Sequence, residues 1–189
     1  MEKKTEIKTD EMPDTVDGYQ VSEKVAIGDL LSKDADDESL NRYKQSLLKT
    51  TECPFPEDER NLIVESLIVQ CEGRDPVSFD PNTNGFTFVM KEGVEYNIKL
   101  SFYVQRDIVS CLKYMNFVSK MGVRVDKSQT NVGSYGPSKD MVQVMIEEGV
   151  TPSGLLGRGK YKAKARLIDD DMNVYLEVEY KFEIKKSWE

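Results

Sequence analysis

The sequence predicts an all-β sandwich that follows a short acidic arm. Downstream of residue 60, apolar and polar residues alternate over several segments, as in strands with one buried face. No helical pattern separates these segments, and turn residues recur between them, which favours a sandwich over a parallel sheet. A length of 189 residues is enough for one core with an appendage. We therefore expect one β domain over 53–189.

The strand predictions depend on period-two patterns. The last strand is the most regular, because apolar residues at every second position from Leu176 to Ile184 alternate with polar ones. The strand before it places Tyr161 and Leu167 on one face and Arg166, with two lysines, on the other. The predicted strands, about eight, are 62–71, 86–90, 94–103, 108–114, 123–126, 141–146, 160–168 and 176–184.

Three polar or glycine-rich segments lie between these strands. Lys91-Glu92-Gly93 predicts a tight turn of hairpin type, because glycine adopts positive φ easily. Residues 133–137 carry two glycines and a proline, which also indicate a turn. The triplet 169–171, all aspartate, fits a hairpin turn, a docking site for a basic peptide or a calcium site. The spaced oxygen ligands of the 12-residue calcium loop are missing.

The arm, residues 1–52, differs from the domain in composition. Residues 1–18 have few large apolar groups and are expected to be disordered when free. Apolar residues at helical spacing predict two short helices, at about 22–32 and 37–50. Helices of two or three turns are marginal in water, so we expect their apolar stripes to need a partner.

Charge and residue counts exclude several function classes. Residues 1–59 hold 16 acids and 8 bases, while residues 60–189 hold 18 of each, which argues against nucleic acid and for a basic partner surface. The absence of histidine excludes histidine acid–base catalysis and leaves no nucleophile–base pair, so we expect no enzyme activity. No metal or cofactor is expected. Three unpaired cysteines and no run of about 18 apolar residues indicate a reduced, intracellular chain outside the membrane.

Several segments together resemble Rho GDP-dissociation inhibitors. They occur in the family's order, with similar spacing, from about Tyr19 to the C-terminus. The segments are Asp36-Asp37-Glu38-Ser39-Leu40, Tyr43-Lys44, Lys91-Glu92-Gly93-Val94-Glu95-Tyr96, Gly133-Ser134-Tyr135-Gly136-Pro137, Asp169-Asp170-Asp171 and Ile184-Lys185-Lys186-Ser187-Trp188. The resemblance implies an immunoglobulin-like sandwich with a helical N-terminal arm, which agrees with the fold predicted from the patterns.

The resemblance also implies a ligand, the geranylgeranyl group of a Rho-family GTPase. The chain departs from the better-known members in its last strand, where Val178 and Tyr180 stand in place of two tryptophans. The pocket could therefore be roomier or shaped for another prenyl chain. The family's pattern places the prenyl pocket at Val69, Phe88, Tyr96, Ile108, Val178 and Tyr180.

The resemblance implies that the arm binds the GTPase switch regions, which retains GDP. The implied GTPase contacts are Asp37, Tyr43, Leu47 and Leu48 in the arm, and Asp126 and Ser134 in the sandwich. The implied docking residues for the basic tail of the GTPase are Asp170, Asp171, Glu147 and Glu148. We expect a cytoplasmic monomer that forms a 1:1 complex with the prenylated, mainly GDP-bound GTPase and approaches membranes only transiently.

Two other binding functions remain open. One is a prenyl-binding carrier of farnesylated Ras-like proteins, which would lack the acidic segment at 36–48. The other is an adaptor sandwich without a lipid cavity.

Overall fold

The computed structural model describes residues 53–81, 83 and 85–188, and every regular element in this part of the chain is a strand. The arm, with its predicted helices, lies outside the described residues. No described segment is a helix that could span a membrane. The strands are β1 (Leu62–Cys71), β2 (Val77–Phe79), β3 (Thr87–Lys91), β4 (Glu95–Val104), β5 (Val109–Lys120), β6 (Val123–Tyr135), β7 (Val142–Val150), β8 (Gly159–Ile168) and β9 (Val174–Lys185).

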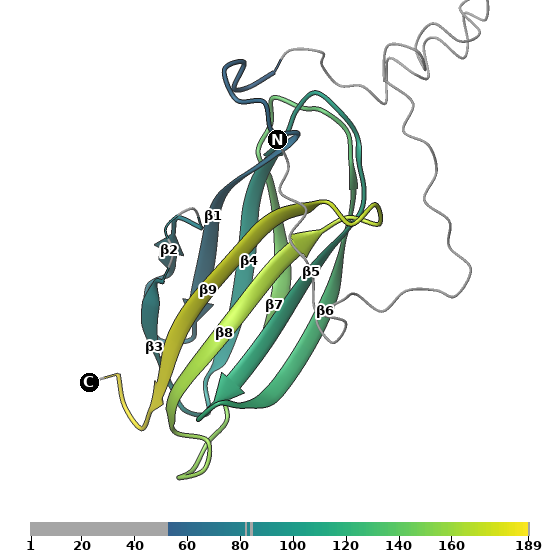
Figure 1. The fold of residues 1–189 in the computed structure, drawn as a ribbon. Helices are drawn as coiled ribbons and strands as arrows, with labels where there is room; N and C mark the ends of the chain where they lie inside the picture. The colour runs from purple at the N-terminus through teal and green to yellow at the C-terminus, as the bar shows by residue number, and fades with distance from the viewer. Residues whose placement is uncertain (1–52, 82, 84, 189) are drawn as a thin grey trace, which may run out of the picture.

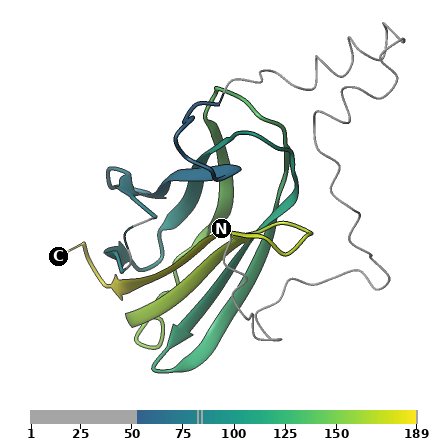
Figure 2. The same cartoon turned by 45° about the horizontal axis from the view of Figure 1, so that its top comes forward.

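The strands form two sheets that pack face to face. One sheet has the order β2-β1-β4-β7 and the other the order β3-β9-β8-β5-β6. Figure 1 shows the five-stranded sheet in front of the four-stranded one, and Figure 2 turns the molecule so that the two layers separate. Paired strands are antiparallel except β3 and β9, which are parallel. The predicted all-β sandwich is confirmed.

The inward faces of both sheets form one apolar core. Leu167 of β8 and Val178 of β9 are fully buried, as the alternation in these strands predicts. Leu67 of β1 and Leu100 of β4 face each other across the strand pair and belong to the same core. Burial of each such leucine contributes about 1.5–3 kcal/mol. The apolar inner faces therefore hold the two sheets together.

The turn after β3 carries the chain from one sheet to the other. The chain turns at Lys91-Glu92-Gly93, as predicted, and Gly93 has a φ of 66°. The strands beside it do not pair, because β3 lies next to β9 whereas β4 lies between β1 and β7. The Glu92 N–H donates to the carbonyl of Lys185, and the Gly93 N–H donates to that of Thr151. The turn is thus bonded to segments from both sheets, and its prediction as a hairpin is wrong.

Both β5 and β6 continue past their predicted ends, and β2 has no counterpart among the predicted strands. In β5, Met115 and Phe117 are buried against Ile168 on the outer side of the sheet, so the strand is apolar on both faces. β6 is a largely exposed edge strand without apolar alternation, and it extends into the segment 133–137 that was expected to be a turn. β2 has three residues, too few to show a period.

The aspartate triplet forms the turn between β8 and β9. Asp169 is buried, and its carboxylate accepts hydrogen bonds from the backbone N–H and side-chain amide of Asn173 and from the Tyr175 hydroxyl, each at 2.8 Å. Short polar side chains favour turns because they bond nearby backbone groups in this way. The hairpin interpretation of the triplet is confirmed.

Arg166 of β8 lies on the face predicted for it, opposite to that of Leu167, but it is buried there. Its guanidinium pairs with Glu177 of β9 at 2.5 Å. Burial is the largest single effect and opposes the charged form of Glu177, but the hydrogen bonds and charges of Arg166 and Lys164 together outweigh it and lower the pKa of this carboxyl. The pair shows how a charged residue is accommodated in a sheet face that the sequence marks as exposed.

Candidate functional site

A cavity of about 500 Å³ lies between the two sheets, at the end that carries the β5–β6 turn and the β7–β8 loop. Successive side chains of a strand face opposite ways, so every second residue of the lining strands faces this space. The volume is typical of small-molecule pockets, which measure ~300–1,000 Å³. The apolar lining from the strands includes Phe88, Met90, Ile98, Val118, Phe182 and Ile184.

Aromatic rings stack along the wall formed by β3, β9 and β8. Tyr180 is stacked on Phe86 with ring centroids 5.0 Å apart, and Phe182 is stacked on Tyr161 at 4.9 Å. Phe88 lies 5.9 Å from Tyr180 and 5.7 Å from Phe182, so it links the two stacks. Aromatic pairs contribute about 0.5–1.5 kcal/mol beyond burial of their area. The stack therefore gives the cavity a continuous apolar wall.

A line of hydrogen bonds joins the two sheets at the cavity. The Tyr96 hydroxyl donates to Glu147 Oε1 at 2.8 Å, and Asn116 Nδ2 donates to Glu147 Oε2 at 2.9 Å. The Tyr180 hydroxyl in turn donates to Asn116 Oδ1 at 3.1 Å. Burial, followed by the nearby charge of Glu147, raises the pKa values of Tyr96 and Tyr180 well above the ordinary 10.0. Both hydroxyls therefore stay protonated, and both oxygens of Glu147 are satisfied.

The opening of the cavity is marked by lining residues that are also exposed. Val125 of β6 and Leu156 of the β7–β8 loop are of this kind. Asp126 and Lys120 also line the cavity, and Lys120 Nζ donates to the carbonyls of Leu156 and Arg158 at 2.6 Å each. Apolar groups and a carboxylate therefore border the opening. This arrangement suits a ligand with a long apolar chain and a cationic neighbour.

Comparisons with known proteins establish the family of the chain. The family model described as RHO protein GDP dissociation inhibitor matches residues 2–187. The chain belongs to this family. It is 37% identical to the human Rho GDP-dissociation inhibitor 1, over 90% of this chain and 86% of the relative. The Arabidopsis thaliana protein of the same name is 37% identical over 89% of this chain and 73% of the relative. The Schizosaccharomyces pombe Rho GDP-dissociation inhibitor is 36% identical over 89% of this chain and 86% of the relative.

The family name describes regulators of Rho proteins rather than enzymes. Within the described residues, no three metal-ligating side chains are grouped where they could hold an ion.

The predicted prenyl-pocket residues of this Rho GDP-dissociation inhibitor family member lie in three different places. Phe88, Tyr96 and Tyr180 line the cavity. Val69 and Val178 are buried in the core and do not line it. Ile108 lies at the other end of the sandwich, just before β5, with 44% of its surface exposed.

The predicted GTPase and tail contacts are also divided between places. Asp126 and Glu147 line the cavity, whereas Glu148 lines a separate groove beside Gly149. Asp37, Tyr43, Leu47 and Leu48 lie outside the described residues.

A second group of predicted contacts meets at the opposite end, around Cys111. The Cys111 N–H donates to Ser134 Oγ at 2.9 Å, and Asp170 pairs with Lys113 at 2.6 Å. A hydrogen bond to Asp170 raises the pKa of the Cys111 thiol, and burial adds to the shift. Asp171 follows in the β8–β9 turn.

Many of the lining residues were not among those expected from the sequence, and Asn116, Leu156 and Lys120 illustrate why. Asn116 stands in the apolar run 114–118, and a buried amide needs partners, so the run itself was a usable signal. Leu156 is one of two leucines in a glycine-rich loop, where leucines have no local structural purpose. Lys120 carried no signal, because its role depends on the carbonyls of a loop far away in the sequence.

Proposed function

We propose that this chain binds a prenylated Rho-family GTPase, holds the geranylgeranyl group in the inter-sheet cavity and inhibits release of GDP. The observation that carries the proposal is an apolar, partly aromatic cavity in a member of this family. A prenyl chain gains about 0.8 kcal/mol per CH₂ buried in a bilayer, so a carrier must offer a comparably apolar site. The stacked wall around Phe88 and Tyr180 has that character.

The carboxylates at the cavity support a second part of the proposal. Asp126 and Glu147 line the cavity that would hold the lipid, and a basic stretch of the GTPase next to its prenylated residue would be attracted to them. Glu147 is fixed by Tyr96 and Asn116, so its charge does not have to be ordered when the partner binds. Attraction of this kind mainly raises the association rate and selects the partner.

The acidic arm completes the proposed mechanism. Residues 1–59 hold 16 acids and 8 bases, so this part of the chain carries the net charge of −8. Asp37, Tyr43, Leu47 and Leu48 would contact the switch regions of the GTPase and keep GDP bound. The product would be a 1:1 complex in the cytoplasm, with the lipid removed from the membrane.

The test uses liposomes loaded with a geranylgeranylated, GDP-bound Rho-family GTPase. We expect the full chain to release the GTPase into the supernatant and to slow its GDP exchange, and to bind the unprenylated GTPase much more weakly. Equal binding of both forms, with the GTPase left on the liposomes, would contradict the proposal. Extraction of a farnesylated Ras-like protein without any effect on GDP exchange would favour a general prenyl carrier.

A second experiment separates the arm from the cavity. Removal of residues 1–52 keeps every residue of the described core in the chain. We expect the shortened chain to bind a geranylgeranylated peptide but to lose inhibition of GDP release. Full inhibition by the shortened chain would show that the arm has been assigned the wrong role.

A further inference from the structure

The turn between β5 and β6 presents a methionine that the fold does not require. Lys120 pairs with Val123, so Met121 and Gly122 form a two-residue turn, with φ values of 50° and 83°. Turns with two positive φ values favour Asn, Asp or Gly, and a side chain such as Met is strained there. Met121 is 94% exposed, so packing does not compensate for the strain. Neither local geometry nor the core explains this residue.

The neighbouring β7–β8 loop presents two leucines in the same manner. Leu155 is 86% exposed and Leu156 is 94% exposed. The loop is nevertheless well anchored, because Glu92 accepts hydrogen bonds from the Gly154 N–H and the Arg158 guanidinium, at 2.7 Å and 2.6–2.7 Å. We call Met121, Gly122, Leu155 and Leu156 the apolar tip.

The two loops of the apolar tip are tied together. Lys120 directly precedes Met121, and its ammonium group donates to the carbonyl of Leu156. Figure 1 shows the β5–β6 turn and the β7–β8 loop at the same end of the sandwich. The apolar tip is therefore a fixed feature of the surface, displayed by polar anchors.

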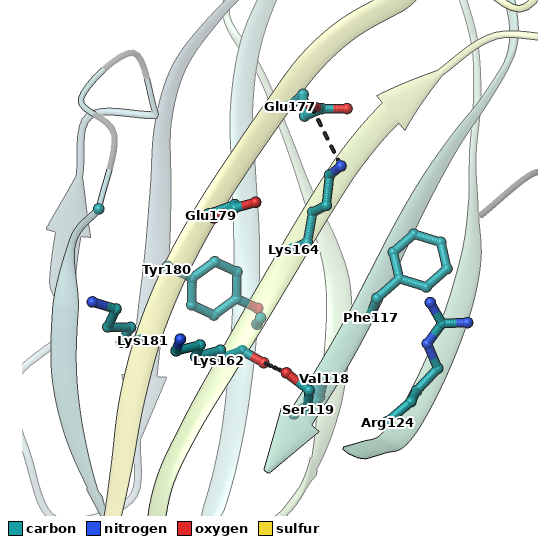
Figure 3. Close-up of a pocket in the computed structure, with 12 residues that line it drawn as sticks. Phe117, Val118, Ser119, Arg124, Lys162, Lys164, Glu177, Glu179, Tyr180 and Lys181 are labelled. Atoms are coloured by element: carbon teal, nitrogen blue, oxygen red, sulfur yellow. Dashed lines mark hydrogen bonds and ion pairs between the residues drawn. The ribbon is translucent and has the colours of Figure 1, made fainter. Parts of the chain in front are cut away.

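A row of cations crosses the outer face of the five-stranded sheet next to the apolar tip. Lys181 of β9 pairs directly with Lys162 of β8, Lys162 pairs with Ser119 of β5, and Ser119 pairs with Arg124 of β6. Figure 3 shows these side chains on one face, with the Ser119 hydroxyl bonded to the Lys162 carbonyl. The Arg124 guanidinium lies 5.2 Å from the ring centre of Phe117. We call Lys181, Lys162 and Arg124 the cationic row.

Two residues of the cationic row, Lys162 and Lys181, have no acidic partner. Like charges directly opposite in a sheet are destabilising, and across the described part of the chain neither of these two lysines forms an ion pair. Glu177 bonds Arg166 and Lys164 instead, while Glu179 and Glu183 lie opposite Lys164 and Lys160 in the rows on either side. A groove lined by Ser119, Met121, Lys162 and Lys181 connects the row with the apolar tip.

The geometry points to a membrane-docking surface, in which the apolar tip enters the headgroup–acyl boundary of an anionic bilayer and the cationic row meets lipid headgroups. Apolar side chains flanked by Lys and Arg are the pattern of interfacial binding, and each cation near an anionic surface adds to it. Residues 60–189 are neutral overall and residues 1–59 are acidic, so the attraction is local and salt-sensitive. This contact goes beyond the proposed function, because it needs neither a GTPase nor a prenyl group.

The test is co-sedimentation of the full chain with vesicles of phosphatidylcholine, with or without about 30% phosphatidylserine. We expect binding that depends on phosphatidylserine and weakens with salt. The variants M121N/L155S and K162Q/K181Q should each lower the partition coefficient roughly ten-fold. Asn suits the positive φ of residue 121, so the first variant should keep its thermal unfolding midpoint. The matched controls M141S/M145S and K99Q/K139Q, away from the apolar tip, should bind like the unaltered chain.

The outcomes separate this surface from the prenyl cavity. Met121, Leu155, Lys162 and Lys181 do not line the cavity, so both variants should still bind a geranylgeranylated peptide without vesicles. The inference is overturned if phosphatidylserine does not increase vesicle binding of the unaltered chain. It is also overturned if the control variants reduce vesicle binding as much as M121N/L155S and K162Q/K181Q do. Loss of peptide binding in the unaltered chain would instead contradict the proposed function alone.

Discussion

The two ends of the sandwich differ in the side chains that their loops bury and expose. At the end opposite the cavity, the fully buried Gln105 bonds the Phe55 N–H and the carbonyls of Asp58 and Arg60, so a polar side chain closes the core. At the cavity end, polar side chains such as Glu92 also hold a loop, but the leucines of that loop face outward. The end closed by Gln105, which we call the closed end, thus contributes to stability, and the cavity end is the one at which we propose binding.

The largest expected effect is on the closed end. Replacing Gln105 with Ala removes three hydrogen bonds at a buried position, so we expect the free energy of unfolding to fall by about 3 kcal/mol. Urea unfolding measures this. Gln143→Ala is the control, because this exposed amide makes one hydrogen bond, to Ser101 at 3.1 Å. Binding of a prenylated peptide below the unfolding transition should not change. If the two variants lose equal free energy of unfolding, Gln105 contributes no more than an exposed amide, and the closed end has no special role in stability.

The second prediction tests where the core ends and the cavity begins along β9. Val178 is fully buried in the core, so Val178→Trp should overpack it and lower stability by about 1–3 kcal/mol. Phe182 lies on the same face, is only half-buried and lines the cavity, so Phe182→Trp should cost less stability and weaken prenyl-peptide binding. The measurements are urea unfolding and peptide titration. If Val178→Trp is tolerated and blocks the peptide, the cavity reaches deeper than the described lining.

The same boundary explains which site residues the sequence could predict. Phe88, Tyr96 and Tyr180, which the family resemblance implied as pocket residues, do line the cavity. The period of two determines only that residues such as these face inward. Val178 faces the same way as Tyr180 but lies two residues nearer the start of β9, farther from the cavity and among core residues. The depth of a residue along a strand depends on register and on how the loops close the sandwich, and neither is contained in a local pattern. Ile108 shows this most clearly, since it lies just before the start of β5, at the end of the sandwich away from the cavity.

The fold shows a similar division between local and long-range information. Strands such as β1 and β9 were predicted from their patterns, since β9 has one buried and one largely exposed face and β1 has its Leu67, Val69 and Cys71 on one buried face. The parallel pairing of β3 with β9 joins residues far apart in the sequence, and the local turn at Gly93 suggested a different partner. β5 lost its alternation because the β8–β9 hairpin covers part of its outer face. The pairing of β3 and the burial pattern of β5 therefore depend on tertiary contacts.

A smaller effect is expected at the hydrogen-bonded line that joins the sheets in the cavity. Tyr96→Phe removes one donor to Glu147 and leaves Asn116 as the other, so the free energy of unfolding should fall by about 1 kcal/mol. Urea unfolding at neutral pH gives the value. Tyr103→Phe, on the opposite face of β4, is the control and should have little effect. If Tyr96→Phe is neutral, Glu147 is satisfied without the tyrosine, and the cavity wall does not depend on it.

The smallest expected effect is a local loosening of the cavity end in acid. The hydrogen bond from the Arg158 side chain, followed by that from the Gly154 N–H, lowers the pKa of Glu92 below its ordinary 4.5. The ionised carboxylate holds the β7–β8 loop, so its contribution is complete above 4.5 and is lost as the pH falls through the lowered pKa. Protection of the Gly154 amide against hydrogen exchange should therefore fall as the pH is lowered below 4.5 and through the lowered pKa. Protection of the Gly93 amide, bonded to a backbone carbonyl, should fall less. In the variant Glu92→Gln, the protection of the Gly154 amide should no longer depend on the ionisation of residue 92. If the Gly154 and Gly93 amides instead lose protection together, the acid transition is global and the two ends of the sandwich are not independent.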